Sequence, residues 1–243
     1  MNETVRNAIN TIAALAGVRV VNRAWGPRGE WASLQNAREA GVRVKHVVDV
    51  GASNGIWTRK ALRIFPDAHF FLFDALESNR SALEKLKREH PACDYWIGAL
   101  GPEPGTREFF STGDQSSFFK SETFPSKEKL QLEIRQLDAF VESGAMALPD
   151  LIKADIQGFE LEMLKGATRC LEHAELVLLE VSFHQVYAHA PLAHDVVAWM
   201  GERGFRLYDL CTYGQRHSDK QLTQSDFLFA PKRSKLFNYE GGA

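Results

Sequence analysis

The sequence predicts an α/β fold in which helices cover a mostly parallel β-sheet. Short β-branched or aromatic segments alternate with helical patterns from Val44 onward, and this alternation is typical of parallel strands joined by helical crossovers. The chain has 243 residues, of which 44% are hydrophobic. A chain of this length and composition can bury a substantial core, so we expect an ordered protein.

The first half of this domain contains three strand-like segments. Residues 47–50 and 70–73 are expected strands, and an apolar-periodic helix follows each of them. These helices stop before Pro66 and Pro91, because proline disfavours helical geometry in the preceding residue. Residues 95–100 are the third strand candidate.

Residues 101–137 interrupt the alternation. The segment is rich in proline and glycine, and its strand-like pair Phe109 and Phe110 favours an insertion or lid over a helix. The alternation then resumes with a short helix over 137–141 and a strand over 151–155. One helix with the apolar stripe Leu161, Leu164, Ala167 and Leu171 follows, and then a strand over 176–181 and a helix around 196–200. Two last strands, over 205–210 and 226–230, are expected with no helix between them.

The sequence divides into three parts. We expect an N-terminal helical extension over 1–43, one main domain over 44–232 with an insertion at about 101–137, and a C-terminal tail over 233–243. Val5, Ile9, Ile12 and Leu15 recur at helical spacing in the extension. This apolar face could pack on the main domain or support a homo-oligomer.

Charge and cysteine content exclude several classes. Lys and Arg number 29 against 31 Asp and Glu, a net charge of −2, so a nucleic-acid partner is not expected. The three cysteines are too few and too far apart for a disulfide framework. There is no apolar stretch of the ~20 residues needed for a membrane span and no secretory signal pattern. We therefore expect a cytoplasmic protein.

The turn Asp49–Gly55 is the first candidate site. It joins a strand to a helix, where glycines permit a tight turn and the free N–H groups of the helix can face a ligand. Ser53 occupies the position where a dinucleotide fingerprint has its second glycine. Taken alone, the turn could bind a ligand or could simply be a tight connection.

Two carboxylates follow later strands. Asp74 comes 25 positions after Asp49, a separation that suits an acid binding the hydroxyls of a nucleoside ribose. Asp155 ends the strand expected beside the first one, where ligands bind in such sheets. Either residue could instead cap a helix.

Three stretches resemble the FkbM family of S-adenosylmethionine-dependent methyltransferases: VDVGASNG at 48–55 with Thr58, LIKADIQGFELEMLKGA at 151–167, and LLEV at 178–181. The resemblance covers roughly Val44 to Ala230. It implies the Rossmann-like class I methyltransferase fold, with a seven-stranded, mostly parallel sheet whose last strand is antiparallel and with helices on both faces. It also implies O-methylation of a hydroxyl on a sugar, glycan or secondary metabolite, with S-adenosylmethionine as cofactor and S-adenosylhomocysteine as product.

The resemblance carries over to named positions. Asp49, Ala52 and Thr58 belong to the first motif, in which Gly51, Ser53, Asn54 and Gly55 would line the methionine part of the cofactor. Asp74 would hold the ribose, Ala75 and Leu76 would lie near the adenine, Asp155 near the amino group or the transferred methyl, and Ser116 and Ser117 match a serine-containing stretch of the family. This sequence departs from the family at Asp74, where glutamate is usual, and at Gln157, where a carboxylate is common.

A hydroxyl acceptor needs a general base, and Asp155, Glu180 and His184 are the candidates. We assign catalysis to Asp155 and His184. His184, His189 and His194 are five residues apart and do not share a helix face, so no metal is expected. Two other functions remain open, an NAD-dependent oxidoreductase and a catalytically inactive binding module with the same fold. The acceptor, a small molecule or a glycan, is not identified by any motif.

Overall fold

The computed structural model describes residues 29–216 and 218–238. The expected N-terminal amphipathic helix with Val5, Ile9 and Ile12 lies outside the described residues, as does the proposed oligomer contact through it. Within the described part of the chain, none of the helices is long and apolar enough to cross a membrane.

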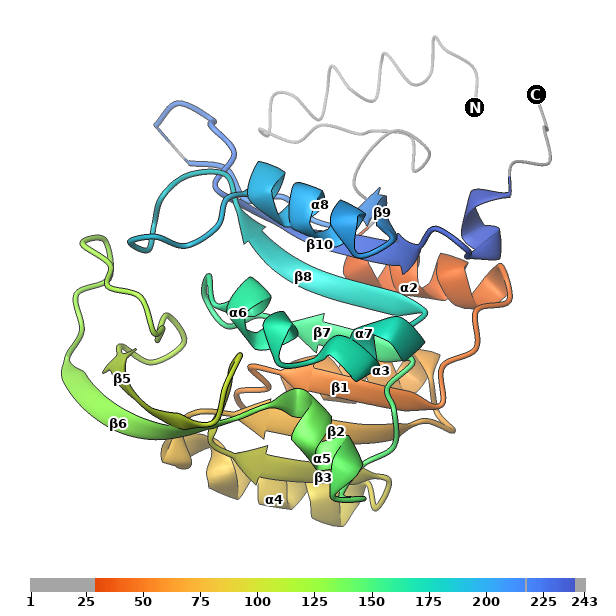
Figure 1. Ribbon diagram of the computed structural model, residues 1–243, viewed down its shortest axis with the longest axis horizontal. Coiled ribbons are helices and arrows are strands. Elements are labelled where there is room, and N and C mark those ends of the chain that lie inside the picture. Colours follow the sequence, from red (N-terminus) through yellow and green to blue (C-terminus); the bar gives the residue numbers. More distant parts are fainter. Residues whose placement is uncertain (1–28, 217, 239–243) are drawn as a thin grey trace, which may run out of the picture.

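A seven-stranded sheet forms the centre of the molecule, with the strand order β3-β2-β1-β7-β8-β10-β9 (Figure 1). Its strands are β1 (His46–Val50), β2 (His69–Asp74), β3 (Cys93–Ile97), β7 (Leu151–Ala154), β8 (Leu176–Ser182), β9 (Phe205–Leu210) and β10 (Gln224–Pro231). β10 runs antiparallel to both of its neighbours, and the pairs from β3 to β8 are parallel. The predicted fold class is thereby confirmed. The strand order reverses between β1 and β7, where such sheets bind ligands.

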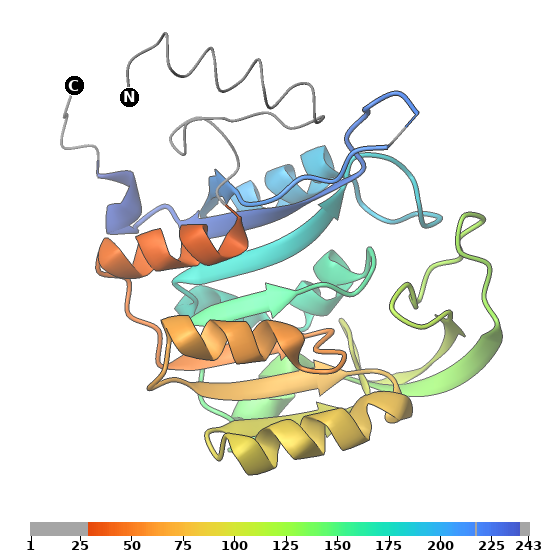
Figure 2. The ribbon, with the colours of Figure 1, turned by 180° about the vertical axis from the view of Figure 1, so that it is seen from behind.

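Helices cover both faces of this sheet. One layer holds α2 (Glu30–Glu39), α3 (Ile56–Ile64) and α4 (Arg80–Glu89), as Figure 2 shows from behind. The other layer holds α5 (Leu137–Glu142), α6 (Glu160–Lys165), α7 (Thr168–His173) and α8 (Ala193–Glu202). A short 3-10 helix, η2 (Glu77–Asn79), precedes α4.

The central strands are buried on both faces, which explains their uninterrupted apolar sequences. In β1 and β7, Val48 and Ile152 pack in the core cluster under α5 to α8. Their neighbours Val47 and Leu151 pack in the other cluster, under α2 to α4. Successive side chains of a strand point to opposite faces, so both helix layers are attached to the same strands.

A second sheet of three strands stands beside the main sheet. It contains β4 (Ala99–Leu100), β5 (Gly105–Ser111) and β6 (Glu128–Arg135), in the order β4-β6-β5. The single strand expected over 95–100 is therefore divided at Gly98. A side chain at Gly98 would come within 2.1 Å of the Trp96 ring, so the break needs glycine.

The helix expected over 161–171 is also divided, into α6 and α7. The chain bends at Gly166, where a Cβ atom would lie 2.1 Å from the carbonyl oxygen of Gly101. This close backbone approach requires glycine and ends α6 after Lys165. The apolar stripe continues across the break because Leu164 and Leu171 both face the same core cluster.

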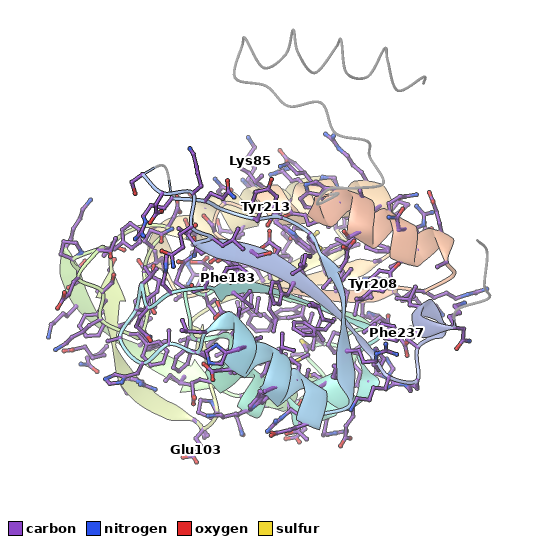
Figure 3. All side chains as sticks on the ribbon, turned by 90° about the horizontal axis from the view of Figure 1, so that it is seen from above. Lys85, Glu103, Phe183, Tyr208, Tyr213 and Phe237 are labelled. Carbon is purple, nitrogen blue, oxygen red and sulfur yellow. The ribbon has the colours of Figure 1, made fainter. Side chains whose placement is uncertain are left out.

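A short 3-10 helix, η3 (Lys235–Phe237), follows β10 and packs with Tyr208 of β9 against the core cluster under α2 to α4. The rings of Tyr208 and Phe237 are 6.1 Å apart, and they lie close together in the view from above (Figure 3). This contact attaches part of the segment that the sequence assigned to the C-terminal tail.

Candidate active site

The turn between β1 and α3 is held in place from two sides. The N–H groups of Gly51 and Ala52 both donate to the carbonyl oxygen of Phe73, at 2.9 and 3.0 Å. A Cβ atom on Gly51 would lie 1.9 Å from the carbonyl oxygen of Asp155, and the Gly51 φ is +74°. The turn is thus packed between the ends of β2 and β7, and only glycine fits at position 51.

A cavity of about 330 Å³ opens at this turn, at the carboxyl ends of β1, β2 and β7. Most of the predicted site residues line it: Gly51, Ser53, Asn54, Asp74, Ala75, Leu76, Ser116 and Asp155. The second sheet and its loop supply apolar wall residues, among them Leu100, Phe109 and Phe118. Residues separated by more than 100 positions in sequence therefore meet around one cavity.

Asp74 connects the parts of this cavity. Its Oδ2 accepts the N–H of Ser53 at 2.7 Å, and its Oδ1 accepts the N–H of Leu76 and the amide of Asn79, each at 2.9 Å. A carboxylate can accept about four hydrogen bonds, so one position remains for a ligand hydroxyl. Asn79 also lines the cavity and was not anticipated from the sequence.

Asp49 and Thr58 do not line the cavity, although the first motif contains both. The Thr58 hydroxyl donates to Oδ2 of Asp49 at 2.6 Å, and Nζ of Lys153 lies 3.0 Å from Oδ1 of Asp49. Asp49 is 0% exposed and pairs with Lys153 in the β1–β7 register. The Lys153 ammonium also donates to the carbonyl oxygen of Gly51 at 3.0 Å, so these residues support the turn from within the sheet.

A second cavity of about 260 Å³ adjoins the first on the other side of the turn. Gly51, Ser53 and Asp155 line both cavities. Ala52 lines the second cavity but not the first. The same holds for the acids Glu30, Glu180 and Asp226. Asp155 thus lines both cavities.

Two glutamates at the second cavity, Glu180 and Glu30, have raised pKa values. Burial, and next the negative charge of Asp155, raises the pKa of Glu180 to about 9. Burial and the neighbouring Asp226 raise the pKa of Glu30 to about 7. For Lys153, burial lowers the pKa, but attraction to Asp49 and Asp155 outweighs this and the net pKa is raised. At neutral pH, the Lys153 side chain is therefore charged, whereas the Glu180 carboxyl group is expected to be protonated.

Glu160 at the start of α6 is 3% exposed, and its Oε1 accepts the N–H groups of Ile156 and Gly158 at 2.8 and 3.2 Å. Burial raises its pKa from 4.5 to about 7, against the effect of these hydrogen bonds. In the unfolded chain Glu160 loses its proton near pH 4.5. Its contribution to the free energy of unfolding therefore decreases as the pH rises from 4.5 to 7.

In the wild type, we expect Glu160 to lower the free energy of unfolding by on the order of 2–3 kcal/mol as the pH rises through this range. In Glu160→Gln this fall should be absent. Urea denaturation at a series of pH values between 4.5 and 7.5 measures it, with the exposed Glu172→Gln on α7 as control. Equal pH dependence in the wild type and in Glu160→Gln would contradict this prediction.

Gly55, Ser117 and His184 also lie away from the first cavity. Gly55 precedes α3 with a φ of +76°, and Ser117 is buried with its hydroxyl donating to the carbonyl oxygen of Gln157 at 2.8 Å. His184 follows β8 and lines neither cavity, so its catalytic role stays a prediction. Among the described residues, no group of three or more His, Cys, Asp or Glu side chains could hold a metal ion.

Comparison with known proteins gives a family and distant structural neighbours. The model of the methyltransferase FkbM domain matches residues 49–207. The hexuronic acid methyltransferase AglP of Haloferax volcanii is 43% identical over 44 residues, which span 18% of this chain and 18% of that protein.

Solved methyltransferase structures match the chain at low identity. The methyltransferase FkbM structure from Methylobacillus flagellatus is 17% identical with a TM-score of 0.49, and the match covers 75% of this chain and 43% of that one. The precorrin-6y C5,15-methyltransferase of Geobacter metallireducens is 11% identical with a TM-score of 0.46, covering 83% of this chain and 86% of that one.

Proposed function

Because the FkbM family model spans residues 49–207, the chain belongs to this family of S-adenosylmethionine-dependent methyltransferases, and we propose that it methylates a hydroxyl group. The proposed acceptor is a sugar, a glycan or a hydroxylated secondary metabolite. One relative, matched over 44 residues, is named for a hexuronic acid, which is consistent with a carbohydrate acceptor.

The observation that carries the proposal is the first cavity, where the Gly51 turn, Asp74 and Asp155 meet. Its residues suit S-adenosylmethionine. The apolar wall of Ala75, Leu76 and Phe118 fits an adenine ring, and the remaining acceptor position of Asp74 fits a ribose hydroxyl. The turn and Asp155 would then border the methionine part of the cofactor.

The cofactor supplies a methyl group bound to a positively charged sulfur, which a hydroxyl oxygen displaces in line. The chain has to align the two reactants and exclude water. Asp155 borders both cavities, so the acceptor can occupy the second cavity while its hydroxyl lies near the same carboxylate. Asp155 would then take up the hydroxyl proton as general base.

An NAD-dependent oxidoreductase is disfavoured by two features. Ser53, with a φ of +48°, occupies the position of the second fingerprint glycine, and the described residues between β9 and β10 contain no helix. The non-enzymatic alternative would keep the same fold but bind no cofactor.

Calorimetric titration tests the cofactor assignment. We expect S-adenosylhomocysteine to bind and NAD to show no binding. Asp74→Asn is expected to weaken S-adenosylhomocysteine binding about 10-fold or more, because its NH2 group replaces one accepting oxygen and must oppose the N–H of Ser53 or the donors of Leu76 and Asn79. The control is Asp94→Asn on β3, where the side chain is 55% exposed. Binding of NAD alone would overturn the proposal.

The acceptor is sought by measuring S-adenosylhomocysteine release with a panel of glycans, lipids and small hydroxylated metabolites. Methyl transfer to at least one hydroxylated compound is expected. Failure of S-adenosylhomocysteine to bind would favour the non-enzymatic alternative, which binds no cofactor.

A further inference from the structure

Gln157 lies at the point where the two carboxylates of the site meet. It follows β7 and is 6% exposed, with its side-chain nitrogen donating to Oδ1 of Asp155 and to Oε2 of Glu180, each at 3.0 Å. One amide group therefore draws together a residue from the end of β7 and a residue of β8. Charge-assisted hydrogen bonds of this kind are the stronger ones in proteins.

The other atoms of Gln157 fix the direction of this amide. Its Oε1 accepts the hydroxyl of Tyr187 at 2.9 Å, so the nitrogen faces the carboxylates. Its carbonyl oxygen accepts the hydroxyl of Ser117, which links it to the loop beside the second sheet. The side chain is thus anchored by segments far from it in sequence.

The backbone at Gln157 is strained. Its φ is +56°, a left-handed conformation that residues other than glycine adopt at a cost of about 1–3 kcal/mol. The next residue, Gly158, has a φ of +93°. Such strain persists only where the surroundings enforce it, and it concentrates at functional sites. A turn that served only to connect β7 to α6 would not need glutamine at this position.

The pair of carboxylates faces charged groups from several elements: Lys153 on β7, Glu160 on α6, Asp226 on β10 and Tyr187 after β8, with Glu30 on α2 beside Asp226. Lys153 is already paired with Asp49. The surplus of acids makes it costly for Asp155 and Glu180 to be ionised together. Two such carboxylates share a proton and titrate as one unit.

We propose that Gln157 is a positioning residue whose amide holds Asp155 and Glu180 as one proton-sharing pair. Oε2 of Glu180 accepts a second amide, from Gln224 at 3.1 Å, and Oδ1 of Asp155 accepts Gln157. Among the described residues, no third group donates a hydrogen bond to Oδ2 of Asp155 or Oε1 of Glu180, while the two carboxyl groups are hydrogen-bonded to each other. Those two oxygens are the ones that hold and exchange the proton.

The use of this pair in catalysis rests on the proposed function. As the acceptor oxygen forms its bond to the methyl carbon, the carbon–sulfur bond breaks and its electrons stay on sulfur. The acceptor O–H bond breaks, and its proton moves to Oδ2 of Asp155 while Glu180 keeps the shared proton. The pair then returns the extra proton to water. Glutamate at position 157 would place a third acid in this contact and hold protons more tightly.

The pairing is tested on the full-length protein without acceptor or cofactor, by following the carbon-13 signals of the Asp and Glu carboxyl groups during a pH titration. In the wild type, Glu180 is expected to titrate near pH 9. In Gln157→Glu, we expect this midpoint to rise by about one pH unit or more, because an acid replaces two N–H donors. Gln157→Met, which removes the donors without adding charge, should raise it by less.

The matched control is Gln131→Glu, which adds the same charge to an exposed position of β6. A midpoint that moves no further in Gln157→Glu than in Gln131→Glu would overturn the proposal. If Gln157→Glu fails to fold by circular dichroism, Gln157→Met carries the test, and an unchanged Glu180 midpoint there would overturn it.

Titration of S-adenosylhomocysteine into the same samples separates this inference from the proposed function. Normal binding with unmoved carboxyl midpoints overturns the pairing alone. Moved midpoints in a protein that binds no S-adenosylhomocysteine support the pairing and contradict the proposed function.

Discussion

Methyl transfer by the Asp155→Asn variant is expected to be about 10²–10⁴-fold slower than by the wild type. Asparagine keeps the size of the side chain but cannot accept a proton from a hydroxyl. Asp155 borders both cavities, and its own N–H donates to the carbonyl oxygen of Val50 at 3.1 Å, so the backbone around it should persist. The loss should therefore appear in kcat. The measurement is S-adenosylhomocysteine release with the acceptor that the panel identifies.

Two controls accompany this variant. Asp67→Asn makes the same chemical change at an exposed residue between α3 and β2 and should retain the wild-type rate. Calorimetry should show that Asp155→Asn still binds S-adenosylhomocysteine within a few-fold of the wild type. A wild-type rate in Asp155→Asn would remove this residue from catalysis.

The Asp49→Ala variant is expected to lose about 3–5 kcal/mol of the free energy of unfolding. Asp49 is 0% exposed, and its carboxylate is 3.0 Å from the Lys153 ammonium, whose side chain is 7% exposed. Alanine would leave this ammonium without its carboxylate and the Thr58 hydroxyl without its acceptor. Urea denaturation at neutral pH, followed by circular dichroism, measures the loss.

The double variant Asp49→Leu with Lys153→Met distinguishes pairing from packing. Removing both charges together avoids the unpaired ammonium, so the double variant should be more stable than Asp49→Ala. If the double variant is no more stable than the single one, the cost comes from lost packing around the turn and not from the unpaired charge.

Much of the fold was predictable because the residues that determine each helix and strand are neighbours in the sequence. The βαβ alternation and the helix ends before Pro66 and Pro91 can be read from neighbouring residues. The breaks at Gly98 and Gly166 were not predictable in this way. Each glycine is required by an approach that only the folded chain creates, to the Trp96 ring in one case and to the carbonyl oxygen of Gly101 in the other.

The candidate site was predictable to the extent that its residues follow strands at one edge of the sheet. The strand order brings Gly51, Asp74 and Asp155 around one cavity. Asp49 was expected among the cofactor-binding residues, but its side chain is buried within the sheet and does not line the cavity. Its position inside the apolar run of β1 is a sequence signal for this burial. The hydrogen bonds of Gln157 to Glu180 and Tyr187 could not be predicted from neighbouring residues, because these partners are 23 and 30 positions away in sequence.

The second sheet has a consequence for how this enzyme family can diversify. Phe109 and Phe118 pack with Phe159 in a cluster separate from the two cores of the main sheet. The same loop lines the first cavity through Gly113, Asp114 and Ser116. Substitutions in this loop should therefore reshape the cavity proposed for the cofactor at a smaller cost in the free energy of unfolding than substitutions in β2 or β7, the strands that position Asp74 and Asp155. The wall of this cavity and the stability of the main sheet depend on different parts of the chain.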